Sequence, residues 1–400
     1  MNLQLKQIAV LGATGSIGRS TLSVIRQHPN KFQVASLTCR KSVEKLCELI
    51  REFKPRLVSV QSEAEAREIR DAFPNLVAMS GSEGLIRVAE DVSTDLVVAG
   101  IVGAVGLYPA YAAISAGKNI ALANKEPLVL AGELFMKEAS RTGATILPAD
   151  SEHNAIFQIL DGRPRQTIRR LILTASGGPF RDLPLEKFSG IRMKDALDHP
   201  NWEMGKKITI DSATMMNKGL EIIEASWLFG IALGKISVLV HRESIVHSLI
   251  EYKDGSLLAQ LGLPDMRIPL SFCLGWPERL ELELPQLDLG ALGALQFEKV
   301  DPLRFPCVGI ALKAADAGQS ATAVLNGANE ALVESYLEEQ ISFLDIPRML
   351  ERVMSYFSRF SKYPDAPACL KEVKTLEDAL QADEWGRDQI LQLKQNRDAA

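Results

Sequence analysis

Two carboxylates stand one residue apart near the first third of the chain, in the run PADSE at 148–152. In extended backbone the side chains of residues i and i+2 project to the same side, so Asp150 and Glu152 would aim at one point. Two convergent carboxylates are well suited to bind a hard divalent cation through oxygen. The alternative is that the run begins a helix, with Ser151 as its N-cap and Glu152 in its first turn.

Residue types that bind phosphate gather further along the chain, after an expected strand at 208–211. They carry a hydroxyl, an amide and an ammonium group, on Ser212, Asn217 and Lys218. Glu221 could add a third carboxylate to Asp150 and Glu152. Glu224, one helical turn later, is a rival that the residues alone leave open.

Two loops could also contact a ligand. The turn SGGPF at 176–180 follows an expected strand at 171–175 and can present backbone N–H groups and the Ser176 hydroxyl to an anion. The loop at 199–206 combines His199 and Trp202 with Gly205, which is typical of a flap that closes over a site. The alternatives are a plain turn and a surface loop that Trp202 pins.

A glycine-rich turn, GATGSIG at 12–18, follows a short apolar run and opens an expected helix. Glycines there permit a tight turn, a close approach of the backbone to a pyrophosphate and close packing of helix on strand. The helix N-terminus adds N–H groups and a positive dipole end. The spacing is GxxGxxG rather than GxGxxG, but its place between strand and helix predicts dinucleotide binding. The alternative is a structural turn.

The end of the second expected strand indicates which dinucleotide is bound. An NAD site would have an acidic residue there, whereas this chain has Arg40, Lys41 and Ser42, which suit a 2′-phosphate and predict NADP(H). The alternative is that Arg40 and Lys41 are solvated side chains near a helix start. A third strand end carries the run NKEP at 124–127. Its Lys125–Glu126 pair could orient the nicotinamide and touch the substrate, or be a surface ion pair of little consequence.

The elements that position these residues alternate between strand and helix over the first 150 residues. We expect strands at 8–11, 32–38, 56–60, 95–98, 119–123 and 144–148, and helices from 16 to before His28, at 42–53 and after Ser62. This alternation predicts βαβ units and a parallel sheet. The uncharged stretch at 96–117 is long enough to cross a bilayer, but its glycines and Pro109 favour a strand, a turn and a helix.

The C-terminal third differs from the rest of the chain in its composition and its pattern of apolar residues. Residues 276–300 are rich in Leu, Pro and Gly and are expected to form a connecting arm. Apolar residues at three- and four-residue spacing predict amphipathic helices at 308–315, 321–338, 346–360 and 376–393, packed as a small bundle.

Bulk properties describe an ordinary protein of the cytoplasm. A net charge of −5 over 400 residues gives no bias toward nucleic acid. The five cysteines are scattered without a CxxC or a zinc spacing, as expected of reduced thiols in a cytosolic protein. The first residues run straight into a strand, so we expect neither a signal peptide nor a membrane anchor.

These segments together resemble the 1-deoxy-D-xylulose 5-phosphate reductoisomerase family of the methylerythritol phosphate pathway. The resemblance spans nearly the whole chain. It is carried by GATGSIG at 12–18, ANKE at 123–126, DSEHNAIFQ at 150–158, SGGPF at 176–180, HPNW at 199–202, DSATMMNKGLE at 211–221, DGSLLAQLG at 254–262 and PDMR at 264–267.

The resemblance implies a role for each matching residue. The metal, Mn²⁺ or Mg²⁺ with Co²⁺ as a further option, would be bound by Asp150, Glu152 and Glu221, which decides for Glu221 over Glu224. The substrate's phosphate end would be held by Ser176, Ser212, Asn217 and Lys218. Its polar backbone would contact Lys125, Ser151 and His199, with Trp202 in the closing flap. NADPH would contact Thr14, Gly15, Ser16, Ile17, Asn124, Glu126 and Gly205. Its 2′-phosphate would be bound by residues 40–42.

The resemblance also implies a fold and a reaction. The expected architecture is an α/β, Rossmann-like NADPH-binding domain at 1–149, an α+β catalytic and dimerisation domain at 150–275 with its flap at 199–206, the arm at 276–300 and a helical domain at 301–400. A homodimer would rearrange and reduce 1-deoxy-D-xylulose 5-phosphate to 2-C-methyl-D-erythritol 4-phosphate. The metal would polarise the carbonyl and NADPH would supply hydride.

The chain departs from the family pattern in three places. Arg40-Lys41-Ser42 stands where a Gly-Lys-Asn type stretch is common, Pro127 replaces a usual Ser, and Arg242 replaces a usual Pro. Two other classes of protein remain possible on the residues alone. A different NADP dehydrogenase would work without Asp150 and Glu152, and a semialdehyde type would need a nucleophile such as Cys273. An NADP-binding sensor would have no use for the carboxylates.

Overall fold

The computed structural model of the chain describes residues 5–160, 162–199, 202 and 204–398. The ends of the predicted first and last domains, and residues 200, 201 and 203 of the predicted flap, therefore lie outside the described residues. The chain forms two compact units. Unit 1 comprises residues 1–127, 135–157 and 265–286, and unit 2 comprises 128–134, 158–264 and 287–400. The predicted boundaries at 149, 275 and 300 stay predictions.

Unit 1 is built on a seven-stranded sheet in the order β4-β3-β2-β1-β5-β6-β7. All neighbouring strands run parallel, which confirms the predicted Rossmann-like sheet. In chain order the strands are β1 (Lys6–Leu11), β2 (Phe32–Thr38), β3 (Leu57–Val60), β4 (Val77–Ser80), β5 (Leu96–Ala99), β6 (Asn119–Leu122) and β7 (Ile146–Pro148). Because the strands are parallel, their carboxyl ends form one edge, where α/β sheets bind ligands.

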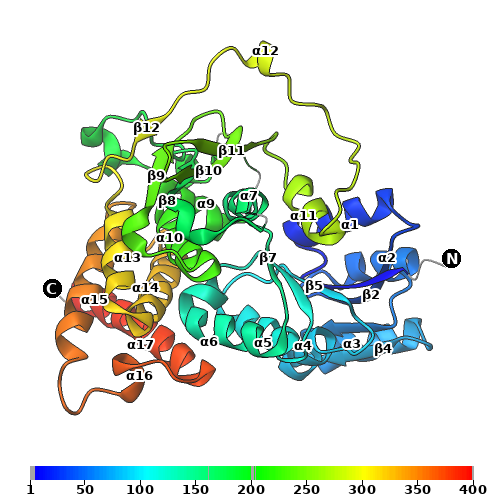
Figure 1. Cartoon of the computed structure of the whole chain (residues 1–400). Coiled ribbons are helices and arrows are strands. Elements are labelled where there is room, and N and C mark those ends of the chain that lie inside the picture. Colours follow the sequence, from blue (N-terminus) through cyan, green and yellow to red (C-terminus); the bar gives the residue numbers. More distant parts are fainter. Residues whose placement is uncertain (1–4, 161, 200–201, 203, 399–400) are drawn as a thin grey trace. The chain divides into compact units, whose positions relative to one another are not determined.

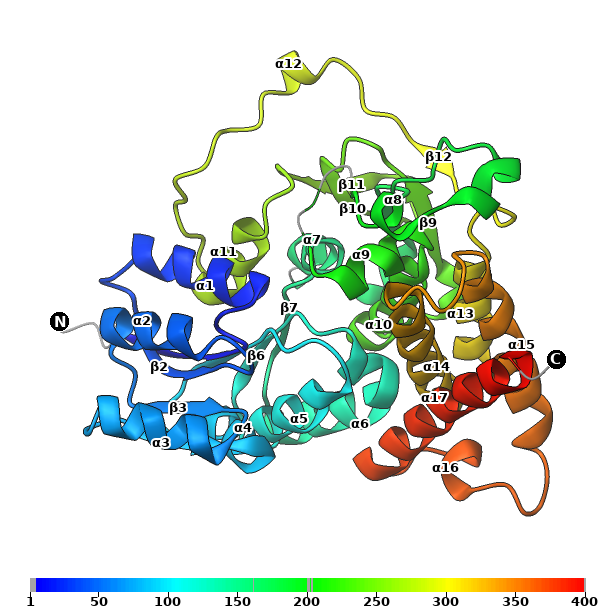
Figure 2. The ribbon, with the colours of Figure 1, turned by 180° about the vertical axis from the view of Figure 1, so that it is seen from behind.

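Helices cover both faces of this sheet (Figures 1 and 2). One face carries α1 (Ser16–Gln27), α2 (Val43–Phe53), α3 (Glu63–Ala72) and α11 (Arg267–Gly275), whose buried residues share one core, and the other carries α4 (Gly81–Ala89) and α5 (Leu107–Ser115). The core between them holds strand residues such as Ile8, Leu37 and Val98, with Leu22 and Leu270 from the helices. Covering both faces explains why these strands are continuous apolar runs.

The uncharged stretch at 96–117 is part of this sheet. It forms β5, a short 3-10 helix (Ala104–Gly106) and α5, as predicted. Over the part of the chain that the structure describes, the helices are too short or too polar to cross a bilayer.

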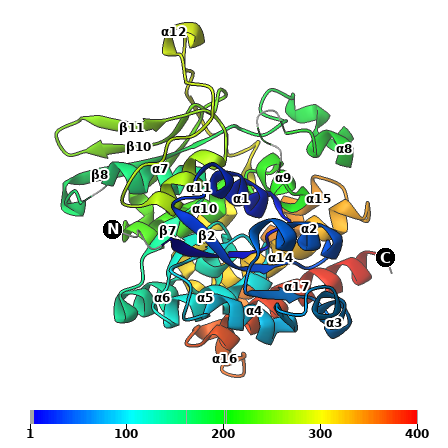
Figure 3. The same cartoon turned by 90° about the vertical axis from the view of Figure 1, so that its right-hand side faces the viewer.

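Unit 2 contains a five-stranded mixed sheet in the order β11-β10-β8-β9-β12. Its strands are β8 (Ile168–Ala175), β9 (Ile236–Val240), β10 (Val246–Tyr252), β11 (Leu257–Leu261) and β12 (Glu298–Lys299). Only β8 and β9 pair in parallel, and the hairpin of β10 and β11 extends the sheet to one edge (Figure 3). Together with α9 (Lys206–Ala213) and α10 (Met216–Phe229), the sheet gives the α+β character that was predicted.

The C-terminal helices of unit 2 confirm the predicted bundle. They are α13 (Pro306–Ala317), α14 (Gln319–Leu337), α15 (Asp345–Phe360), the short α16 (Ala368–Lys371) and α17 (Leu376–Asp398). Most of α14 is buried, because α13, α15 and α17 all pack against it. The predicted arm contains only α12 (Leu289–Leu292) and β12 as regular structure within 276–300.

The remaining elements connect these parts. They are α6 (Glu126–Thr142), α7 (Ser151–Leu160), α8 (Met193–Ala196) and the 3-10 helices Arg165–Thr167, Leu185–Gly190 and Leu233–Lys235. Helix α6 bends at Ala131, whose φ of −146° and ψ of 35° are not helical.

One predicted element is wrong: residues 208–211 are not a strand but the middle of α9. The alternation of Ile208 and Ile210 with polar residues imitates the two-residue period of a strand. The structure instead shows helical bonding, since the Thr209 hydroxyl donates to the carbonyl of Gly205 at 3.0 Å. Lys207 also pairs with Asp211 one turn later. Tertiary packing decides between the two periods here.

Candidate active site

The carboxylates of Asp150 and Glu152 lie where β7 meets α7. The extended geometry predicted for them is wrong, because α7 begins at Ser151 and Glu152 lies in its first turn. The alternative, a helix start, is correct except for the cap. Asp150, not Ser151, accepts from the backbone N–H groups, at 3.1 Å from Glu152 and 3.4 Å from His153. The Ser151 hydroxyl donates to Glu152 Oε2 at 2.5 Å.

Lys125 extends from the end of β6 to this carboxylate. Its ammonium group forms an ion pair with Asp150 Oδ2, and the two side chains are only 12% and 13% exposed. The alternative of an exposed Lys125–Glu126 ion pair does not fit this burial, because the Glu126 side chain is buried as well. Asn124 is buried beside it and donates to the carbonyl of Gly103 at 3.2 Å. The ends of β6 and β7 therefore hold charged groups together at the carboxyl edge of the sheet.

The glycine-rich turn has the geometry of a phosphate cradle. Gly12 has a φ of +82°, and a Cβ there would lie 3.0 Å from the carbonyl oxygen of Gly100. A Cβ on Gly18 would lie 2.4 Å from the Ala13 oxygen, so glycine is needed for α1 to pack this closely. Gly15 begins α1 without a side-chain cap. The first N–H groups of this helix therefore remain available to an anion.

The residues predicted to bind a 2′-phosphate follow β2. Arg40 and Lys41 are exposed, and Ser42 is the residue before the first turn of α2. Cys39, which the sequence argument overlooked, joins this loop to the glycine-rich turn. Its sulfur accepts from the Ser42 N–H at 3.2 Å and lies 3.3 Å from Thr14 Oγ1. Two halves of one predicted cofactor site are thus in contact.

In unit 2, the predicted phosphate-binding residues lie on or next to three elements. Ser176 follows β8, Ser212 lies in the last turn of α9, and Asn217 and Lys218 lie in the first turn of α10. The turn after β8 packs directly on α9, since a Cβ on Gly178 would lie 2.7 Å from the Ser212 oxygen. The N-terminus of α10 adds the positive end of a helix of 14 residues.

Glu221 belongs to the same cluster. The Asn217 amide donates to Glu221 Oε1 at 2.5 Å, and Lys218 forms an ion pair with Oε2. Glu221 is 1% and Lys218 3% exposed. Where the residues alone left Glu221 and Glu224 open, the structure thus places Glu221 with the phosphate-binding candidates.

The described residues of the predicted flap contact Ser176, one of the predicted phosphate-binding residues, through His199. The Trp202 N–H donates to His199 Nδ1 at 2.9 Å, so the neutral imidazole carries its hydrogen on Nε2. Nε2 lies 3.0 Å from Ser176 Oγ, which also accepts from the Gly178 N–H at 3.2 Å. With two donors already directed at this oxygen, the Ser176 hydroxyl hydrogen is left to donate to an anion.

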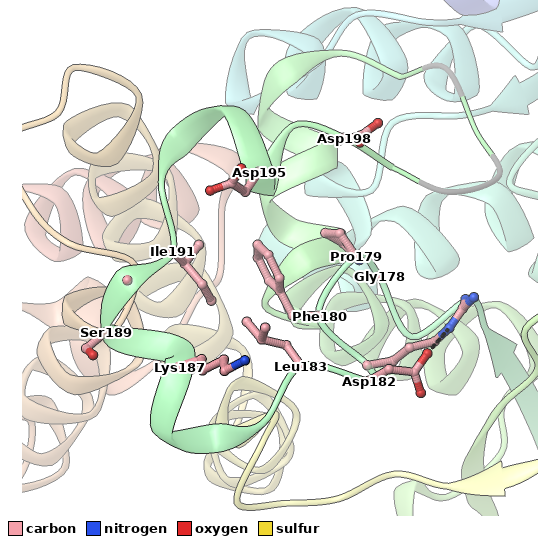
Figure 4. A pocket seen from close by; sticks show the side chains of 12 residues that line it. Gly178, Pro179, Phe180, Asp182, Leu183, Lys187, Ser189, Ile191, Asp195 and Asp198 are labelled. Atoms are coloured by element: carbon pink, nitrogen blue, oxygen red, sulfur yellow. Dashed lines mark ion pairs between the residues drawn. The ribbon is translucent and has the colours of Figure 1, made fainter.

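A cavity of about 770 Å³ lies beside the same turn, lined by residues from Gly178 to Asp198 (Figure 4). Arg181 in its wall donates to the Ser176 carbonyl at 2.7 Å and thereby supports the turn. Asp182 is held by Arg242 at 2.7 Å and 2.9 Å. This bond lowers the pKa of Asp182. The unusual Arg242 also binds Glu298 at 2.6 Å, so it ties the turn to β12.

Cys273 does not suit the role of a nucleophile. It is fully buried, and burial raises the pKa of its thiol to about 12. A reactive cysteine needs a low pKa and access to substrate. The semialdehyde dehydrogenase alternative therefore lacks its central residue.

Comparisons with known proteins agree over the whole chain. Three family models match: 1-deoxy-D-xylulose 5-phosphate reductoisomerase at residues 8–132, its C-terminal domain at 146–229, and a further DXP reductoisomerase C-terminal domain at 261–389. A 1-deoxy-D-xylulose 5-phosphate reductoisomerase of Synechococcus sp. (strain JA-2-3B'a(2-13)) is 49% identical over 401 residues, covering 99% of both chains.

Solved structures match equally well. A DOX-P reductoisomerase in complex with NADPH, fosmidomycin and magnesium is 44% identical, with a TM-score of 0.90 over 98% of this chain and 100% of that one. The Zymomonas mobilis reductoisomerase in complex with NADPH is 40% identical, with a TM-score of 0.89 over 98% and 99%. The sheet, the glycine-rich turn and the carboxylates described above are thus matched by full-length sequence and structural similarity, and the chain belongs to the 1-deoxy-D-xylulose 5-phosphate reductoisomerase family.

Proposed function

We propose that the residues assembled above carry out the reaction of this family in the roles that the sequence predicts. The reaction is the NADPH- and divalent-metal-dependent conversion of 1-deoxy-D-xylulose 5-phosphate to 2-C-methyl-D-erythritol 4-phosphate, a step of isoprenoid precursor synthesis. The observation that supports these roles best is the contact of Glu221 with Asn217 and Lys218, which joins a candidate metal ligand to two candidate phosphate ligands.

Asp150, Glu152 and Glu221 would hold the cation. Each of the three offers a carboxylate oxygen as a ligand. Oxygen-only ligands favour Mg²⁺ and Mn²⁺. A relative was solved with magnesium, and we propose that Mn²⁺ and Co²⁺ also serve this chain. Lys125 and Lys218 fit this assignment, because each already places a positive charge on one of these carboxylates. When bound, the metal polarises the substrate's carbonyl oxygen.

Ser176, Ser212, Asn217 and Lys218 would bind the substrate's phosphate. Hydroxyl, amide and ammonium donors on a helix N-terminus complement a phosphate dianion in both charge and hydrogen bonding. His199 and Trp202 would close over the bound phosphate, because His199 contacts Ser176 and Trp202 contacts His199. Their closure would exclude water from the reacting carbons. Lys125 and Ser151, beside the candidate metal ligands, would orient the sugar's polar backbone.

NADPH would bind along the carboxyl edge of the unit 1 sheet. The glycine-rich turn at Thr14, Gly15, Ser16 and Ile17 would take the pyrophosphate, and Arg40, Lys41 and Ser42 the 2′-phosphate. Asn124, Glu126 and Gly205 would contact the rest of the cofactor, as the family resemblance implies. The turn fits this assignment, because Gly12 adopts a positive φ that favours glycine and the first N–H groups of α1 have no side-chain cap. When bound, the nicotinamide supplies the hydride.

We also propose a homodimer in the cytoplasm, formed by unit 2. Strand β11 is the edge of its sheet, and Leu257 and Leu258 on it are 53% and 39% exposed. An edge strand with exposed leucines is suited to pair with the same strand of a second copy. Sedimentation of the parent and of Leu258→Lys tests this, since the variant should shift the mass toward the monomer.

NADPH oxidation with 1-deoxy-D-xylulose 5-phosphate tests the proposed roles. We would compare the parent, Glu152→Gln and the exposed control Glu351→Gln, with Mg²⁺ or with a chelator. Turnover should require the metal, collapse in Glu152→Gln and persist in Glu351→Gln. Turnover that is unchanged by the chelator and by Glu152→Gln would contradict the assignment of the metal ligands.

A further inference from the structure

One buried carboxylate next to the phosphate cluster has no role in the assignment above. Asp211 is 1% exposed and lies in α9, directly before Ser212. Lys207 Nζ lies 3.0 Å from its Oδ2, and the amide of Asn329 donates to its Oδ1 at 2.8 Å. Asn329 is fully buried in α14 and is 118 residues away in sequence. The C-terminal bundle therefore contacts α9 through a hydrogen bond to a buried carboxylate.

Helix α9 links two parts of the proposed site, the predicted flap and the phosphate-binding residue Ser212. It begins after Gly205, at the end of the flap, and ends with Ser212 and Ala213. With only eight residues it depends on tertiary contacts for its orientation. The bond from Asn329 to Asp211 fixes this helix one residue before Ser212. A buried carboxylate that loses a hydrogen-bond partner is costly, so α9 must shift when the bond is removed.

We propose that Asn329 is a positioning residue for the substrate's phosphate group, acting through Asp211 on Ser212 and on the end of the flap. Lys207 is the second partner of the Asp211 carboxylate and also helps to hold Ser212 in place. This inference rests on the proposed role of Ser212. A displacement of about 1 Å in such a contact can change a rate or affinity by up to about a hundredfold.

Asn329→Ala and its matched control Asn326→Ala test the proposal. Asn326 is also fully buried in α14, one turn earlier, but its amide donates to Asp383 at 2.7 Å and not to α9. For each variant we would measure kcat, KM for 1-deoxy-D-xylulose 5-phosphate, KM for NADPH and the thermal midpoint. Asn329→Ala should raise KM for the sugar phosphate about tenfold, with KM for NADPH unchanged. Asn326→Ala should lower the midpoint without changing either KM.

Lys207→Met gives a second route to the same answer if Asn329→Ala folds poorly, because Lys207 is partly exposed at 20%. It should also raise KM for the sugar phosphate selectively. The double variant Asp211→Asn/Asn329→Asp reverses donor and acceptor and should recover part of the lost affinity.

Equal effects of Asn329→Ala and Asn326→Ala, or parallel rises in both KM values, would overturn the proposal. Failure of the proposed function is a separate result. In that case Asn217→Ala, which removes a direct phosphate ligand, would also leave KM for the sugar phosphate unchanged.

Discussion

His199 Nε2 lies 3.0 Å from Ser176 Oγ, and its Nδ1 accepts the N–H of Trp202 at 2.9 Å. One imidazole thus connects the described flap residue Trp202 to the serine that we assign to the substrate's phosphate. If phosphate binds at Ser176 as we propose, we expect the hydrogen bonding of His199 to change, and with it the contact of His199 with the backbone of Trp202.

This coupling makes His199→Ala a test of flap closure. The variant removes the donor to Ser176 and the acceptor for Trp202 together, so KM for 1-deoxy-D-xylulose 5-phosphate should rise about tenfold. The change of tryptophan fluorescence on substrate binding should also shrink. His199→Gln keeps one donor and one acceptor and should recover part of both effects. A normal fluorescence change in His199→Ala would contradict the coupling.

Metal binding should stabilise the fold and depend on Glu221. A ligand present at a hundred times its Kd stabilises the native state by about 2.7 kcal/mol. Saturating Mg²⁺ should therefore raise the thermal midpoint of the parent by several degrees and that of Glu221→Gln by much less. Calorimetric unfolding with and without Mg²⁺ measures this independently of turnover. Equal shifts in the parent and in Glu221→Gln would remove Glu221 from the ligand set.

Most of the fold can be predicted from the sequence where the local pattern and the tertiary environment agree. Helix α1 ends at Gln27, before His28 and Pro29, as predicted. The capping box of α3 is complete, with Ser62 and Glu65 bonding each other's backbone. Strand β4, whose residues at 77–80 are only partly buried, carries no clear alternation and was not predicted. The error at α9 has the opposite cause, because a two-residue alternation is present there within a helix.

The site was predictable as residue types but not as geometry. Motifs such as DSEHN indicate which residue types could bind a metal. Whether Asp150 ends a strand or caps a helix depends on backbone hydrogen bonds, which the sequence does not specify. Long-range partners are less visible still. Asp211 and Asn329 lie 118 residues apart and belong to no common motif. Cys39 was predicted only as a reduced thiol, and the contacts of its sulfur with Thr14 and Ser42, in the two predicted cofactor-binding loops, could not be foreseen.

The loop after β2 should determine the preference for NADPH over NADH. Arg40→Ala should reduce kcat/KM for NADPH about tenfold or more and leave that for NADH nearly unchanged, since only NADPH carries the 2′-phosphate. Steady-state kinetics with both cofactors measure the ratio. Lys45→Ala, an exposed cation on α2, is the matched control and should leave the ratio intact. A ratio that survives Arg40→Ala, Lys41→Ala and their combination would contradict this assignment.

Two buried thiols should make the protein sensitive to alkali. Burial raises the pKa of Cys273 and of Cys307 from 9.0 to about 12. The folded state therefore favours the neutral thiol, and this contribution is fully present below pH 9, where the unfolded thiol is also neutral. As pH rises toward 12, these thiols ionise only in the unfolded chain, so each thiol reduces the free energy of unfolding by about 1.4 kcal/mol per pH unit.

Urea unfolding of the parent and of Cys307→Ala at several alkaline pH values measures this slope. The variant should be less stable at neutral pH because of the cavity, but its stability should fall less steeply with pH. Identical slopes would mean that Cys307 ionises alike in both states.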